Sequence, residues 1–279
     1  MRAFATIALG LVALVGGAWL ARTFWVDAFK IPQAGMAPTL FPGDHVFVRK
    51  SAYGWLEHRV PARGDIVVFR YPEHPEQDFV QRVIGLPGDT ITVQLGAVFI
   101  NGWRVPTCVA GQVEIEDRGK PHPGVAVVEL LGETAYLVFH DEAALRAQTQ
   151  QHAHGEESEG HHHDTPSQGP YTVAHNEVFV LGDNRENSND SRLWFEGRGG
   201  GVRFDQIKGR ASSIWRAGDH AGNVPRSKSG SSLIGAPTCP EGFSPATCAA
   251  LAQCLASRPA RDATTPPDDR STGAATPKL

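Results

Sequence analysis

DFVQRVIGLPGD, residues 78–89, is the stretch that decides the fold of this chain. It is an apolar run rich in β-branched residues, closed by a Pro-Gly-Asp sequence. A run of this kind predicts a strand that enters a tight turn. Successive side chains of a strand point to opposite faces, so we expect Gln81 and Arg82 on opposite sides, with Arg82 in a structural role.

Similar short runs, rich in Val, Ile and aromatic residues, recur along the chain between Gly, Pro, Asn or Asp. This composition favours strands. Asn101 and Gly102 stand between two apolar runs, which is the strongest short signal for a β-hairpin. The sequence therefore predicts a mostly β, antiparallel domain, with strands within residues 45–53, 65–71, 78–86, 91–100, 177–183 and 207–215.

The 279 residues are expected to divide into three parts. An N-terminal anchor covers 1–26, one β domain covers 27–217, and a tail rich in Gly, Ser, Pro and Thr covers 218–279. The net charge of −4 argues against a nucleic-acid partner. The sequence contains no heptads, internal repeats or glycine-rich phosphate loop.

The run from Ala3 to Ala21 carries no charged side chain. As a helix it would be about 28 Å long, close to the ~30 Å hydrocarbon core of a bilayer. Trp19, Phe24 and Trp25 suit an interfacial aromatic belt and favour an uncleaved transmembrane helix. A cleaved signal peptide is the alternative, because small residues at 16–18 stand at cleavage spacing.

A second motif, GDNRENSNDSR at 182–192, is too dense in Asp, Asn, Arg and Ser for an ordinary surface loop. Together with IPQAGMAPTL (31–40), GDHVFVRK (43–50), RGDIVVF (63–69) and the 78–89 stretch, it makes five collinear blocks. These blocks resemble the type I signal peptidase family of membrane-anchored Ser/Lys endopeptidases. The resemblance implies an antiparallel β domain with one N-terminal transmembrane helix. It also implies a single-pass protein of the cytoplasmic (inner) membrane, with the bulk of the chain on the extracytoplasmic side.

Three working positions of the family are altered. The family's first block reads IPSGSMxPTL with the second serine as nucleophile, and Gly35 stands at that position. Its third block ends YIKRVIGLPGD with the lysine as general base, and Gln81 stands there. The first serine, a donor to the oxyanion hole, aligns with Gln33. Glycine has no attacking atom and a glutamine amide is no base near neutral pH. The comparison therefore predicts a catalytically inactive homologue that uses no cofactor.

The residues that surround these positions in the family are retained. Ser188 aligns with the serine that hydrogen-bonds the lysine amine. Asp190 and Arg192 align with residues that hold the loops of the site through a charge-assisted contact. Because there is no lysine to orient, we interpret Asp190 and Arg192 as a structural ion pair.

The resemblance also implies where a peptide would bind, as an added strand that needs neither serine nor lysine. The implied peptide-binding residues are Ile31, Pro32, Gln33, Asp78, Phe79 and Val80. The expected partners are signal peptides or exported precursor proteins, the membrane and an active signal peptidase paralogue.

An active signal peptidase remains the alternative function. It requires a relocated nucleophile, for which Thr39 and Ser188 are the candidates, and a new base, for which His45 and His175 are the candidates. No histidine occupies position 81, which disfavours this hypothesis.

Residues 141–170 lack any apolar period and predict a solvated loop inserted in the domain. Its histidines could bind Zn²⁺ or Ni²⁺ loosely. They lack the spacing of a closed metal site, so polar low-complexity filler is the favoured interpretation of His152, His154, His161, His162 and His163.

Three of the four cysteines lie in the tail. Cys239, Cys248 and Cys254 surround a short helical pattern, TCAALAQCLA, and Cys108 makes the number even. Outside the cytoplasm these thiols can oxidise. The sequence leaves the pairing open and allows either two disulfides or one disulfide with two free thiols.

Overall fold

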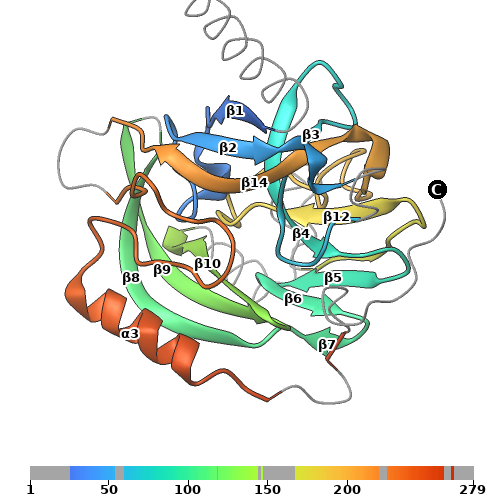
Figure 1. The fold of residues 1–279 in the computed structure, drawn as a ribbon. Helices are drawn as coiled ribbons and strands as arrows, with labels where there is room; N and C mark the ends of the chain where they lie inside the picture. The colour runs from blue at the N-terminus through green and yellow to red at the C-terminus, as the bar shows by residue number, and fades with distance from the viewer. Residues whose placement is uncertain are drawn as a thin grey trace, which may run out of the picture.

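The computed structural model describes residues 26–53, 60–117, 119–143, 146, 167–219, 225–260 and 265–266. Over these residues the chain folds into three antiparallel sheets (Figure 1). The expected mostly β fold class is confirmed. Within the described part, no helix is long and apolar enough to span a membrane, and Ala3–Ala21 lies outside it.

The largest sheet has the strand order β1-β2-β14-β3-β4-β12-β13. Both of its faces are covered by apolar clusters, because β3 and β4 bury side chains on each side. One cluster contains Ile31, Leu40 and Val68, and the other contains Phe69 and Trp194. The strands are β1 (Val26–Lys30), β2 (His45–Arg49), β14 (Ile207–Arg216), β3 (Ile66–Arg70), β4 (Asp78–Gly85), β12 (Glu177–Leu181) and β13 (Val202–Arg203).

A four-stranded sheet, β11-β5-β6-β7, follows the turn at Pro87–Asp89. Asn101 and Gly102 have φ values of 55° and 81° and connect β6 to β7, so the predicted hairpin is confirmed. Residues 91–100 form two strands, because Leu95 and Gly96 also take positive φ and make a second tight turn. The strands are β5 (Thr90–Gln94), β6 (Ala97–Ile100), β7 (Trp103–Arg104) and β11 (Ser167–Thr172).

The third sheet, β10-β9-β8, is built from β8 (Thr107–Asp117), β9 (Lys120–Leu131) and β10 (Thr134–Asp141). One face of it carries the helix α3 (Pro245–Ala256), seen in Figure 1 along the curved strands β8 and β9. Leu251 and Cys254 of α3 are buried against Ala126 and Val128 of β9. The short helical pattern predicted in the tail is therefore present.

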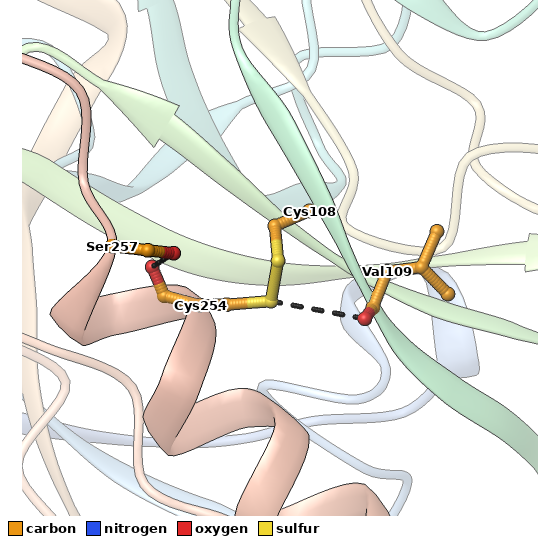
Figure 2. The surroundings of a disulfide bond; sticks show 4 residues. All are labelled: Cys108, Val109, Cys254 and Ser257. Carbon is orange, nitrogen blue, oxygen red and sulfur yellow. Dashed lines mark hydrogen bonds between the residues drawn. A yellow bond between two sulfur atoms is a disulfide. The ribbon is translucent and has the colours of Figure 1, made fainter.

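Two disulfides fasten this tail. Cys108 of β8 is bonded to Cys254 of α3 (Figure 2), and Cys239 is bonded to Cys248. The sequence allowed either two disulfides or one disulfide with two free thiols, and the structure contains two disulfides.

The loop predicted at 141–170 has different boundaries in the structure, where Asp141 is the last residue of β10. Residues 167–170 of the expected loop belong to β11, because their backbone pairs with β5 although their side chains have no apolar period. The five histidines of that loop lie outside the described residues. Three short 3₁₀ helices complete the fold, η1 (Ala34–Met36), η2 (Lys50–Ala52) and η3 (Phe204–Gln206).

Candidate functional site

The site forms where η1, β4 and the loop at 182–192 meet. Gly35 lies in the middle of η1, next to the buried residues Ala34 and Met36. A Cβ built on Gly35 would be 3.5 Å from the carbonyl oxygen of Asn187 and 3.7 Å from Oγ of Ser188. These are ordinary van der Waals contacts, so a Cβ at position 35 fits without displacing its neighbours.

Gln81 approaches the same point from β4, and it is buried, with 4% of its surface exposed. Its Nε2 donates to the carbonyl oxygen of Asn189 at 2.7 Å and to Oγ of Ser188 at 3.3 Å. The Oε1 atom has no hydrogen-bond partner among the described residues. The neutral amide of Gln81 thus donates a hydrogen bond to Ser188, while its buried Oε1 has no partner among the described residues.

Hydrogen bonds from the loop hold it against η1. The backbone N–H of Asn184 donates to the carbonyl of Gly35 at 3.1 Å, and its Nδ2 donates to the carbonyl of Ala34 at 3.2 Å. Gly182 is required here, because a Cβ at that position would lie 2.1 Å from Oγ of Ser188. The structure therefore brings Gly35, Gln81 and Ser188 together, as the motif alignment predicts.

Asp190 and Arg192 fix the path of the loop. The guanidinium of Arg192 donates to both carboxylate oxygens of Asp190, at 2.7 and 2.8 Å, and also to the carbonyl of Arg185. Asp190 in addition accepts the backbone N–H of Gly182 at 3.0 Å. These contacts all lie within the loop, which is the arrangement expected of a structural ion pair.

Arg82 lies on the side of β4 opposite to Gln81. Its guanidinium makes a bidentate contact with Asp183 at 2.8 and 2.6 Å and donates to the carbonyl of Gly64 at 3.0 Å. Burial opposes its charge, but the carboxylate of Asp183 outweighs burial and raises the pKa of Arg82 above its usual value. Asp183 also accepts a hydrogen bond from the hydroxyl of Thr39.

A second buried ion pair, which no sequence motif predicted, joins the loop to the three-stranded sheet. Arg185 makes a bidentate contact with Glu129 of β9 at 2.7 Å for both bonds. Burial and the carboxylate of Glu129 raise the pKa of Tyr136 well above its usual value, so its hydroxyl remains protonated and donates to Glu129 at 2.7 Å. An uncompensated Glu among the apolar residues of 125–131 was the available sequence signal.

The candidates for a relocated active site are not assembled. The hydroxyl of Thr39 is engaged with Asp183 and Arg82. The ring of His45 contacts Trp215 edge-on, and His175 is exposed. In the described part of the chain, no hydrogen bond joins either histidine to Thr39 or Ser188. That part of the chain also contains no group of three or more His, Cys, Asp or Glu residues that could hold a metal ion.

The six residues implied in peptide binding do not lie on one common face. Ile31 and Val80 belong to one apolar cluster. Phe79 faces the other side, where its ring stacks on Tyr71 with centroids 4.4 Å apart. Asp78 forms a 2.6 Å ion pair with Lys208, while Pro32 and Gln33 are exposed. Gln33 makes no side-chain hydrogen bond to the start of η1.

Comparison with known proteins identifies the class to which this fold and site belong. The family model described as signal peptidase, peptidase S26, matches residues 2–216. Because this match covers most of the chain, the protein belongs to the signal peptidase S26 family.

Among individual relatives, the signal peptidase I of Pseudomonas aeruginosa is 32% identical over 209 residues, which are 70% of this chain and 66% of that protein. The signal peptidase I of Aquifex aeolicus is 28% identical over 223 residues, covering 71% of this chain and 78% of that protein. The chain thus spans about two thirds of the length of the Pseudomonas relative. A solved signal peptidase I from Enterococcus faecalis aligns with 55% of this chain and 97% of its own chain. The sequence identity is 22% and the TM-score is 0.27.

Proposed function

We propose that this protein is a catalytically inactive signal peptidase homologue that binds signal peptides of exported precursors without cutting them. The observation that carries the proposal is the contact of Gln81 with Ser188 beside Gly35. An amide and a glycine occupy the places where a signal peptidase has its base and its nucleophile. Neither group attacks a peptide bond or removes a proton near neutral pH.

The edge of β4 supports peptide binding. On its β3 side, the carbonyl of Gln77 and both backbone groups of Val83 are hydrogen-bonded. By the alternation of an antiparallel ladder, Asp78 and Val80 direct their N–H and C=O groups to the other edge. In the described residues, β12 pairs with that edge only as far as Arg82. The edge at residues 78–80 is therefore available for an added strand.

The apolar run Ala3–Ala21 supports a location at the membrane. A single span of this length would tether the β domain at the bilayer on the extracytoplasmic side, where exported precursors emerge. A peptide held there without cleavage would compete with an active signal peptidase paralogue, or be passed to it.

Two measurements test the proposal. Fluorescence polarisation with a labelled Ala-x-Ala peptide should show binding that is lost in Val80→Pro, because proline removes the edge N–H. Val80→Ala is the matched control, since it loses a similar apolar contact but keeps the N–H. Equal binding by the two variants would refute strand addition at this edge.

The second measurement addresses the alternative function. Membranes that contain this protein should leave an added preprotein unprocessed. Specific processing that disappears in Thr39→Val or Ser188→Ala would instead establish an active signal peptidase with a relocated nucleophile.

A further inference from the structure

The side-chain oxygen of Gln81 is a polar atom that the proposed peptide site leaves unexplained. Gln81 is 4% exposed, and its Oε1 has no hydrogen-bond partner among the described residues. A buried acceptor that makes no hydrogen bond destabilises a protein, so such atoms are uncommon unless something else meets them.

The orientation of the Gln81 amide is set by its neighbours. The carbonyl oxygen of Asn189 lies 2.7 Å from one amide atom, and a carbonyl oxygen accepts only a donor at that distance. That atom is therefore Nε2, and Oε1 lies about 2.2 Å from it by amide geometry. Nε2 is 3.3 Å from Oγ of Ser188, which in turn would lie 3.7 Å from a Cβ built on Gly35.

A second unpaired acceptor lies at the same junction. Oδ1 of Asn184 is buried without a partner among the described residues. The backbone N–H and Nδ2 of Asn184 donate hydrogen bonds to backbone carbonyls of η1. The nearby carboxylates are already paired, Asp183 with Arg82 and Asp190 with Arg192. Two unpaired acceptors with no free carboxylate beside them favour a neutral hydrogen-bond donor over an ammonium group, which would lose its hydration without a counter-charge.

The backbone of a peptide supplies such a donor at this point. A strand added beside Asp78 and Val80 must leave the edge where β12 begins to pair with Arg82. In register with β4, the next peptide N–H would have no strand partner and would lie beside Gln81.

Building on the proposed function, we propose that Oε1 of Gln81 accepts a hydrogen bond from the bound peptide at the N–H that lies opposite Gly35. A lysine ammonium only donates and cannot pair with an N–H. The glutamine is thus complementary to an intact peptide bond. A catalytic base at the same position would instead favour the transition state of cleavage. The terminal torsion of Gln81 is broad and soft, so Oε1 can turn toward the peptide when it binds.

Peptides in which one amide is replaced by an ester test this hydrogen bond, because an ester lacks the N–H. The probe is a labelled Ala-x-Ala peptide, with the ester moved one bond at a time, and the measurement is its Kd by polarisation. We expect one position, near the second Ala, at which the ester weakens binding by about five- to tenfold beyond the loss at its neighbours. In Gln81→Met this extra loss should vanish.

Two control variants complete the design. Gln94→Met, at the exposed end of β5, should retain the extra loss. Gln81→Glu should also retain it, because burial keeps the new carboxyl protonated. One oxygen then donates to Asn189 as Nε2 does, and the other remains an acceptor. This variant replaces Gln81→Met if the latter fails to fold. Equal ester losses in the native protein and Gln81→Met, or loss of the effect in Gln81→Glu, would overturn the inference while peptide binding still stands. Failure of every peptide to bind would overturn the proposed function as well.

Discussion

At the scale of single residues, the centre of the site is altered without being distorted. Gly35 lies among ordinary contacts, and the amide of Gln81 bonds the same Ser188 that the family motif places beside a lysine. Because the surrounding loop keeps its ion pairs, the proposed loss of catalysis depends on two side chains and not on a collapse of the loops around them.

Restoring both side chains should therefore restore cleavage. Gly35→Ser alone should remain inactive, because its hydroxyl has no base. Gly35→Ser with Gln81→Lys should cut a preprotein about 100-fold or more faster than the single variant, as expected for general-base catalysis. Burial should lower the pKa of the new lysine and free its amine to take the proton.

The measurement is the rate of preprotein cleavage by the purified variants, with gel and mass identification of the cut. Gly35→Ser with Gln94→Lys is the matched control, since it adds the same charge on an exposed residue of β5. Equal rates for the single and double variants would contradict the alignment of Gln81 with the base.

At the scale of elements, the tail beyond β14 is a structural part of the domain. Ser231 and Leu233 exchange backbone hydrogen bonds with residues 212–214 of β14. The helix α3 then covers one face of β8 and β9, with Leu251 buried there. The helix is only 12 residues long and carries no charged side chain, so its packing and its disulfides, more than its own propensity, hold it in place.

The two disulfides should contribute unequally to stability. The Cys108–Cys254 bond joins residues 146 apart, whereas the Cys239–Cys248 bond joins residues 9 apart. In the chain-entropy model the longer loop contributes about 5 kcal/mol and the shorter about 3 kcal/mol. The double Cys→Ser variant at 108 and 254 should therefore lower the free energy of unfolding in urea more than the one at 239 and 248. The reverse order would show that strain or residual structure outweighs loop length.

At the scale of the whole molecule, the site loop connects separate sheets. Asp183 anchors it to β4 of the large sheet through Arg82, and Arg185 anchors it to β9 of the three-stranded sheet through Glu129. Glu129 is 1% exposed and also accepts a hydrogen bond from the hydroxyl of Tyr136. The position of the site thus depends on contacts between sheets.

Removing one member of the second anchor should be costly. Glu129→Gln leaves the charge of Arg185 buried without a full partner and should lower the free energy of unfolding by about 3–5 kcal/mol. Glu196→Gln, in an exposed pair 3.9 Å from Arg198, should change it by less than about 1 kcal/mol. Urea unfolding followed by circular dichroism measures both, and similar losses would mean that the buried pair does not support the fold.

Local sequence patterns predicted several elements of this structure. The alternation in residues 78–86, the Asn101–Gly102 turn and the helical pattern at 247–256 each predicted an element that is present, because neighbouring residues alone decide strand and turn preferences. Residues 167–170 were missed, because their strand depends on pairing with β5 and not on their own side chains.

By itself, then, the sequence determined the β class and the family motifs, and it predicted the loss of nucleophile and base, since residue identity decides whether a side chain can supply an attacking atom or a proton acceptor. Only the tertiary structure decided the disulfide pairing, the Arg185–Glu129 anchor and the unpaired oxygen of Gln81. The physical reason is that each depends on the distance between atoms far apart in the chain, and the packing of three sheets sets those distances.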